Sequence, residues 1–290
     1  MYRAARRRLI LPFLLPQLVL YTFITFASIV ATVGLAFTSW AGVNPRKFIG
    51  LGNFRRMLTD SGFQRTIGNS LYYMVAGGIL LLVLAFFLAW SLHEIRRGKR
   101  LFRFLILAPA VVSVSVAAVM WRWIYNPLFG IVGYPLRLLG DKYEIGALLT
   151  GVLRDTTTAL TFVILTHLWH GMGAWVLLLL AGFQRLPPEL MEAARVDGAN
   201  ERQVFFHVTL PLMWELLRIL IVLWIMAALQ AFSYVFIMRS RGVMATYVYS
   251  MTFDRWDWAY GMALATAMMA AIFIIVVFTN RILQRQVEEY

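Results

Sequence analysis

The chain has 290 residues, of which 61% are hydrophobic and only 14% are charged. This composition is too apolar for an ordinary soluble domain and predicts a protein of the lipid bilayer. Because the sequence contains no cysteine, disulfides, thiolate metal sites and cysteine nucleophiles are excluded. The formal charge of +13 lies in segments that flank apolar stretches, where membrane topology and contacts with membrane lipids account for it better than nucleic acid does.

The first apolar stretch follows a cluster of arginines and extends from Leu9 to Trp40. A signal peptide can begin in the same way, but its apolar core has only about 7 to 15 residues. We therefore expect a retained first helix. Pro12 and Pro16 lie near its beginning, where they can kink the helix without ending the span.

Five further apolar stretches supply the roughly 20 residues that a helix needs to cross a bilayer, or nearly that number. They are Ser70–Leu92, Phe104–Trp121, Thr156–Phe183, Ile219–Met238 and Trp258–Asn280. The six stretches contain no Asp, Glu, Lys or Arg, each of which costs about 2.5 to 3.5 kcal/mol at the centre of a membrane helix. The predicted fold class is an all-α membrane protein with six transmembrane helices.

The distribution of basic residues predicts the orientation in the membrane. More than half of the 27 Lys and Arg residues lie in the N-terminus, in the C-terminal tail and in the loops after the second and fourth spans. Since cytoplasmic segments carry an excess of positive charge, this bias predicts that both termini are cytoplasmic. The loop between the fourth and fifth spans, residues 184–218, is then cytoplasmic too.

The cytoplasmic loop contains its own helix signals. Pro188 suits the first turn of a helix, where the missing N–H is not needed. Glu189 and Glu192 place negative charge near the positive end of that helix. Ala193 and Ala194 are small, so a partner surface can approach them closely. These residues predict a short helix with an accessible face.

A second set of signals follows. Gly198 can end the first helix in the left-handed conformation. Asn200 and Gln203 form a plausible cap and third-position partner for a second helix, which runs toward Leu210 and Pro211. A helix of about ten residues is marginal alone in water. It therefore gains stability either in the groove of a partner protein or by lying on lipid or on its own helix ends.

This loop resembles the Glu-Ala-Ala motif of the membrane subunits of binding-protein-dependent ABC importers, specifically of the carbohydrate type. The matching residues are Glu192-Ala193-Ala194, Asp197-Gly198 and Leu210-Pro211. The approach to the second span, Gly50-Leu51-x-Asn53-Phe54, and the start of the last span, Tyr260-Gly261-x-Ala263, are also similar to the family. Gly182-x-Gln184 resembles the first of the family's two subunit types, as in maltose or glycerol-phosphate importers. The segment Met238–Val243 departs from the Thr-x-Gly-Gly-Pro of many relatives, so the resemblance does not define the outer gate or the substrate.

The resemblance implies a type I ABC importer permease fold in the cell membrane. It implies a second, different permease subunit, two cytoplasmic ATPase subunits and an extracytoplasmic substrate-binding protein. ATP and Mg would bind to the ATPase subunits and no cofactor to this chain. The Glu192 to Gly198 segment would dock in a cleft of one ATPase subunit, with Glu192 and Asp197 as polar contacts. The implied domains are residues 1–65 (first helix and first periplasmic loop), 66–282 (transmembrane core, with the coupling loop 184–218) and 283–290 (tail).

Polar residues within the spans are the candidate substrate contacts, because sugar sites combine a few hydrogen-bonding groups with apolar and aromatic walls. Gln230 and Ser233 lie three residues apart on the fifth span, which predicts that they share one helix face. Trp169, His170 and Gly171 on the fourth span are the second choice. Hydrogen bonding between helices and close packing are the alternative roles for all five residues.

Two other classes of function agree less well with the sequence than the importer subunit does. A secondary transporter, or another channel-like membrane protein, lacks its usual coupling groups here, because the spans contain no charged residue. The sequence contains no paired carboxylates, metal-ligand cluster or activated nucleophile that would support an intramembrane enzyme, and no catalytic residue is predicted. His167 and His170 are close together but have no third metal ligand at a suitable spacing.

Overall fold

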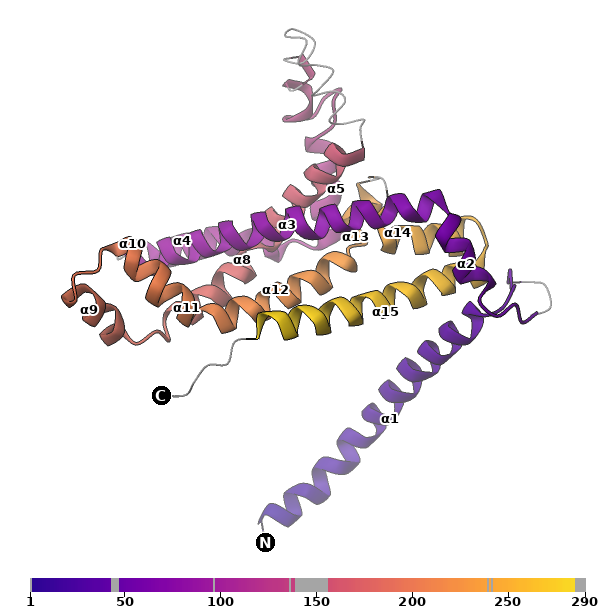
Figure 1. Ribbon diagram of the computed structural model, residues 1–290, viewed down its shortest axis with the longest axis horizontal. Coiled ribbons are helices and arrows are strands. Elements are labelled where there is room, and N and C mark those ends of the chain that lie inside the picture. Colours follow the sequence, from indigo (N-terminus) through magenta and orange to yellow (C-terminus); the bar gives the residue numbers. More distant parts are fainter. Residues whose placement is uncertain are drawn as a thin grey trace. The chain divides into compact units, whose positions relative to one another are not determined.

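The computed structural model describes residues 2–42, 47–95, 97–135, 137–138, 156–238, 240 and 242–284. These residues form helices and connections, and the only β-type pairing among them is an isolated antiparallel bridge between Thr38 and Phe48. The helices before residue 125 are α1 (Tyr2–Ala36), α2 (Gly52–Thr59), α3 (Ser61–Glu94), α4 (Lys99–Leu107), the 3₁₀ turn η1 (Ala108–Val111) and α5 (Val114–Ile124) (Figure 1).

The second half begins with α8 (Thr156–Phe183), which has the bounds predicted from the sequence. It continues with α9 (Pro188–Val196), α10 (Glu201–Val204), the π-helical turn η2 (Phe205–Thr209), α11 (Leu210–Leu212), α12 (Trp214–Leu229), α13 (Ser233–Ile237), α14 (Met244–Tyr249), the π-helical turn η3 (Ser250–Asp254) and α15 (Trp258–Leu283). Among the described residues, five spans are long and apolar enough to cross a membrane. The bent pair Lys99–Val111 and Val114–Ile124 makes a sixth if it counts as one span.

The chain divides into two compact units. Unit 1 comprises Met1–Gln64 and Tyr247–Ala270, and unit 2 comprises Arg65–Thr246 and Ala271–Tyr290. The helices α3 and α15 each contribute to both units. The division into residues 1–65, 66–282 and 283–290 stays a prediction.

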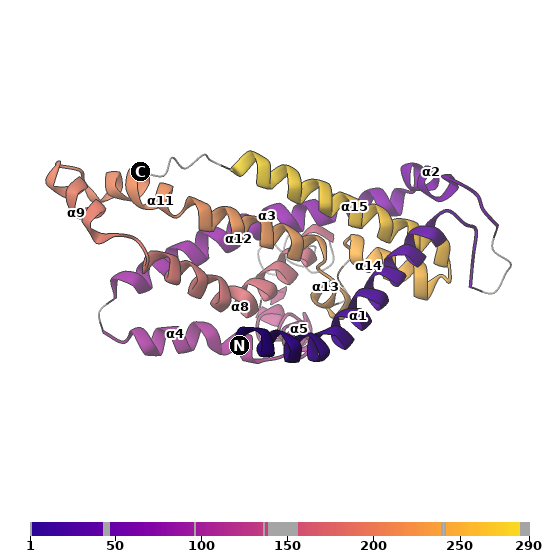
Figure 2. The same cartoon turned by 90° about the horizontal axis from the view of Figure 1, so that it is seen from below.

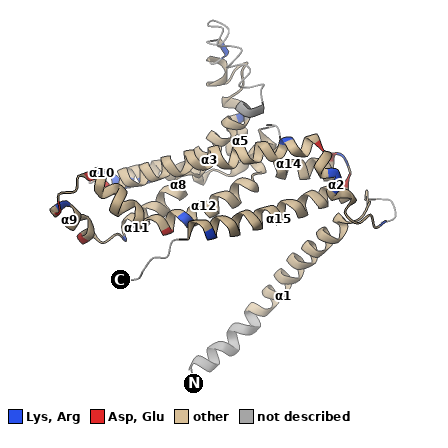
Figure 3. Cartoon of the chain, in the orientation of Figure 1, with Lys and Arg blue, Asp and Glu red and all other residues tan. Residues whose placement is uncertain are grey.

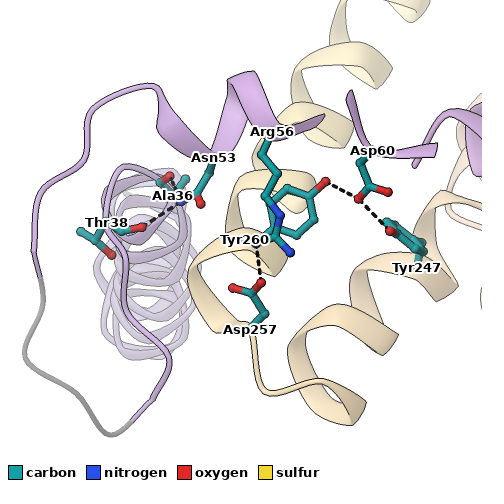
Figure 4. Close-up of polar contacts among 8 residues, drawn as sticks. All are labelled: Ala36, Thr38, Asn53, Arg56, Asp60, Tyr247, Asp257 and Tyr260. Atoms are coloured by element: carbon teal, nitrogen blue, oxygen red, sulfur yellow. Dashed lines mark hydrogen bonds and ion pairs between the residues drawn. The ribbon is translucent and has the colours of Figure 1, made fainter. Parts of the chain in front are cut away.

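In unit 1, Asn53 fixes the segment that leaves the first helix. Its side-chain amide donates to the backbone oxygens of Ala36 and Thr38, both at 2.8 Å, and the side chain is buried (Figure 4). The Ala36 carbonyl at the end of α1 has no partner further along the helix, so the Asn53 amide satisfies it. This contact gives a structural reason for the asparagine of the Gly50-Leu51-x-Asn53-Phe54 segment.

A second polar cluster in unit 1 joins α2 to α14 and α15. The Asp60 carboxylate accepts hydrogen bonds from the hydroxyls of Tyr247 at 2.8 Å and Tyr260 at 2.6 Å (Figure 4). Arg56 pairs with Asp257 at 2.6 Å, and its guanidinium lies 3.9 Å from the centre of the Tyr260 ring. Burial raises the pKa of Asp60, but the hydrogen bonds from the two tyrosines and from two backbone amides together lower it.

In unit 2, the helices α3, α8 and α12 run side by side (Figures 1 and 2). Trp224 of α12 donates its indole N–H to the Met74 oxygen of α3 at 2.8 Å. A Cβ atom added at Gly77 or Gly78 would lie 2.6 Å from a Trp224 side-chain atom. The two glycines therefore allow the indole ring to pack directly against the α3 backbone.

The third and fifth predicted spans are interrupted. The axes on either side of Val112 and Ser113 meet at 93°, and α12 ends four residues before α13 begins. Val112 and Ser113 have extended backbones, and the Ser113 hydroxyl accepts from the Val116 amide as the cap of α5. Hydropathy measures the length of an apolar stretch and not the continuity of its helix, so the sequence did not predict these breaks.

Candidate functional site

The coupling loop lies at one end of unit 2, where α9 and α10 carry charged side chains while the visible length of α8 carries none (Figure 3). The helix α9 begins at Pro188, after Pro187 in an extended conformation, and Glu189 lies in its first turn. Proline fits this position because its backbone angle is already helical and its nitrogen needs no acceptor. The predicted start of the first short helix is confirmed.

Gly198 ends α9 as the sequence predicts. Its φ is +87°, in the left-handed region. Its amide donates to the Arg195 oxygen at 3.1 Å, and the Ala199 amide donates to the Ala194 oxygen at 3.0 Å. This pair of bonds is a Schellman motif, which satisfies the last carbonyls of the helix. A Cβ atom at Gly198 would meet no described atom within 4 Å, so the backbone conformation, rather than space, calls for glycine.

Asn200 and Gln203 start the second helix with a capping box. The Asn200 side chain accepts from the Gln203 amide at 2.9 Å, and the Gln203 side chain accepts from the Asn200 amide at 2.8 Å. The predicted cap is therefore confirmed. The helix then widens into the π-helical turn Phe205–Thr209 before Pro211. Pro211 has no N–H for the preceding turn, and a local change of helical pitch accommodates this loss.

An ion pair across the glycine turn was not predicted. Arg195 donates two hydrogen bonds to the Glu201 carboxylate, at 2.8 and 3.1 Å. This hydrogen bonding lowers the pKa of Glu201 and raises the pKa of Arg195. Both side chains are exposed, so the pair contributes little to stability, but its two-pronged geometry orients α9 relative to α10. Opposite charges on the two sides of Gly198 were the available sequence signal.

The predicted contact residues occupy the exposed part of α9. Glu192, Ala193 and Asp197 are exposed, and Ala194 is half-buried. A shallow hollow of about 400 Å³ opens beside them, lined by Ala194, Asp197, Gly198, Ala199, Gln203, His207 and Val208. The helix thus presents acidic and small side chains together with an adjacent depression. That an ATPase subunit binds them stays a prediction.

The loop is anchored to the spans through its apolar residues. Leu210 is half-buried and packs, with Leu186, against a core cluster that contains Phe183, Met213 and Leu217. Pro211 is exposed in the next position. The ion pair therefore joins α9 to α10, and Leu210 joins α11 to a cluster formed by residues that include Phe183 of α8 and Leu217 of α12.

The substrate candidates on the fifth span lie at the break between α12 and α13. Gln230 follows the last residue of α12, Phe232 has φ −114° and ψ −60°, and Ser233 begins α13. The same-face interpretation assumed a continuous helix, and it stays a prediction. Gln230 is exposed beside the break, while Ser233 is half-buried.

The candidates on the fourth span engage neighbouring helices. Trp169 packs edge-to-face on Trp121 of α5, with ring centres 5.3 Å apart. His170 has hydrogen-bond partners at both ring nitrogens, the Val112 oxygen and the Tyr234 hydroxyl, each at 2.7 Å. A Cβ atom at Gly171 would be 3.6 Å from the His167 ring, an ordinary contact, so packing does not demand glycine there.

The described residues contain no group of three or more metal-ligating His, Cys, Asp or Glu side chains that could hold a metal ion.

The family model described as "Binding-protein-dependent transport system inner membrane component" matches residues 94–289. The chain belongs to this family. It is therefore a membrane-embedded permease subunit of an ABC importer, a transport component rather than an enzyme. The matched residues include the whole coupling loop, so the resemblance first seen in the Glu-Ala-Ala motif is confirmed for most of the chain.

Two of the relatives match most of the permease, and a third matches a little over half of it. A probable ABC transporter permease protein of Bacillus subtilis, YurN, is 30% identical over 266 residues, which are 89% of each chain. The multiple sugar-binding transport system permease protein MsmF of Streptococcus mutans is 28% identical over 83% of each chain. The sn-glycerol-3-phosphate permease protein UgpA of Agrobacterium fabrum is 29% identical over 57% of this chain and 54% of its own.

Solved structures identify the fold. A chain of a bacterial ABC transporter involved in the import of alginate superposes with a TM-score of 0.80 at 20% identity, covering 99% of both chains. A structure of the alginate transporter in complex with its pentasaccharide-bound periplasmic protein gives a TM-score of 0.81 at 21% identity. The permease thus has the type I ABC importer fold predicted from its sequence.

Proposed function

We propose that this permease forms one half of the membrane path of an ATP-driven carbohydrate importer. Its partners would be a second, different permease subunit, two cytoplasmic ATPase subunits that bind ATP and Mg, and an extracytoplasmic protein that delivers the substrate. Both termini and the coupling loop would face the cytoplasm. The multiple-sugar permease MsmF and the glycerol-phosphate permease UgpA support this class of substrate.

The observation that carries the proposal is the construction of α9. Its start, its end and its angle to α10 are each fixed by local contacts, yet Glu192, Ala193 and Asp197 remain exposed. A nine-residue helix with so much uncovered surface gains stability from a groove in another protein. Closure of the ATPase pair would then move α9, and the packing of Leu210 would pass this movement to the spans.

Substrate delivery outside and ATPase closure inside must favour the same conformation, because coupling between two sites is reciprocal. Among the five substrate candidates, Gln230 has an exposed amide beside a helix break. Gln230→Ala is expected to weaken the apparent affinity for the transported sugar while ATPase assembly is kept. An unchanged affinity would remove Gln230 from the substrate path.

Cross-linking tests the central contact. Because the sequence has no cysteine, Ala193→Cys introduces the chain's only thiol. We expect it to cross-link to a co-purified ATPase subunit through a short bifunctional reagent. The matched control is Leu58→Cys, which is 75% exposed in the connection predicted to face outward. Failure to recover an ATPase subunit with the tagged permease, or equal cross-linking from both positions, would contradict the proposal.

A further inference from the structure

Two interrupted spans of unit 2 meet at one histidine. The third span breaks at Val112 and Ser113, and the fifth breaks between α12 and α13. His170 lies near the middle of the continuous helix α8 and contacts both. We infer that His170 is a positioning residue which, with the Val112 carbonyl and the Tyr234 hydroxyl, ties the two breaks together so that α5 and α13 move as one. We call these three groups the histidine link.

The first contact arises from the break itself. In a continuous helix the Val112 oxygen would accept a hydrogen bond from the Val116 amide. Here that amide donates to the Ser113 hydroxyl instead, at 3.3 Å. A carbonyl without a partner is costly inside a membrane, where no bulk water replaces the lost bond. The Nε2 of His170 supplies a partner at 2.7 Å.

The second contact follows from the first. A carbonyl oxygen can only accept, so Nε2 carries the proton of the neutral ring and Nδ1 is free to accept. The Tyr234 hydroxyl donates to Nδ1 at 2.7 Å. Tyr234 is 7% exposed and lies in the first turn of α13, directly after the second break. One imidazole therefore satisfies a group at each interruption.

This arrangement has a mechanical consequence, which rests on the proposed function because it concerns the transport cycle. Breaks in helices are positions where backbone angles can change while the pieces on either side stay rigid. The α5 piece also reaches α13 through Arg122, whose guanidinium donates to the Ile237 oxygen at 3.5 Å. If α13 moved without α5, the link would separate and leave polar groups unpaired within the spans.

A neighbouring pair provides a matched control. Tyr73 and His167 form the same kind of hydroxyl-to-Nδ1 hydrogen bond, also at 2.7 Å. They belong to α3 and α8, which run without interruption at those positions. Tyr73→Phe and Tyr234→Phe each remove a tyrosine hydroxyl that is hydrogen-bonded to a histidine of α8. Only the second change affects a group that joins two breaks.

The test uses spin labels in the assembled transporter. Val119→Cys in α5 and Phe236→Cys in α13 give the permease, which has no cysteine of its own, two labelled positions, and other subunits are used without reactive cysteines. Dipolar broadening of the EPR spectrum reports the distance between the labels. We expect one narrow distance population in the otherwise unchanged permease and in Tyr73→Phe, and a wide one in Tyr234→Phe and His170→Ala.

Transport measurements give a second readout. Tyr234→Phe is expected to lower sugar uptake per ATP hydrolysed by about tenfold with an unchanged apparent affinity. A tenfold change corresponds to about 1.4 kcal/mol. The double variant with His170→Ala should be no worse than His170→Ala alone. Equal broadening in Tyr73→Phe and Tyr234→Phe, or a changed affinity without broadening, would overturn the inference. If no ATPase subunit binds, the proposed function fails, while label distances in the lipid-reconstituted permease still test the link.

Discussion

Replacing Gly198 by alanine would test whether the coupling loop depends on one backbone conformation. The residue has φ +87°, and an added Cβ would have no described atom within 4 Å. The substitution therefore adds no clash and changes only the preference of the backbone. For a residue other than glycine, the left-handed conformation costs about 1 to 2 kcal/mol.

This cost would fall on the Schellman motif at the end of α9. Since about 1.4 kcal/mol changes an equilibrium tenfold, the motif should open roughly 5 to 30 times more often. The amides of residue 198 and Ala199, which donate to Arg195 and Ala194, would exchange their hydrogens faster by the same factor. Hydrogen-exchange mass spectrometry on the reconstituted permease measures this change in the peptide that contains both amides.

Gly198→Asn is the matched control, because asparagine tolerates the left-handed conformation better than alanine does. It should exchange at a rate between those of the wild-type permease and Gly198→Ala. Unchanged exchange in Gly198→Ala, or equal acceleration in both variants, would refute the conformational argument. In the assembled importer, Gly198→Ala should also lower transport more than it lowers the amount of permease in the membrane.

Two further predictions concern the spans and unit 1. Gly78→Ala places a Cβ against Trp224 and should destabilise the permease by about 1 to 3 kcal/mol, whereas Gly68→Ala, in open space on the same helix, should be neutral or stabilising. Thermal unfolding in detergent compares the two. Asp60→Asn should cost about 1.5 to 3 kcal/mol at pH 7, because it replaces a charged acceptor of the Tyr247 hydroxyl. Since the folded pKa of Asp60 is lowered, the advantage of aspartate should persist above about pH 4 and disappear as the pH falls further, and unfolding at pH 7 and pH 3 checks this.

The sequence predicted those features that depend on local pattern. The bounds of α8, the start of α9, the left-handed Gly198 and the capping box at Asn200 all follow from hydropathy, from proline and glycine geometry, or from side chains within three residues of the groups they cap. Such signals act between neighbours in the chain, so they are visible without the fold.

The features that were missed depend on distant partners. Asp60 accepts hydrogen bonds from residues 187 and 200 positions away, and no spacing rule connects them. The bend at Val112 was missed for a different reason. Its surroundings are apolar throughout, and hydropathy does not separate a continuous helix from two pieces. Ser113 and Pro109 were the local signals of a cap and a missing amide.

The polar chemistry of the spans bears on the nature of the substrate. The six apolar stretches of the sequence contain no charged side chain, so the contribution of this permease to the path within them is neutral. His170 is hydrogen-bonded to Tyr234, and His167 is hydrogen-bonded to Tyr73. The exposed amide of Gln230 lies beside the break of the fifth span, where it can donate to and accept from the hydroxyls of a substrate. We therefore expect the contribution of Gln230 to carbohydrate recognition to be a hydrogen bond at the break of the fifth span.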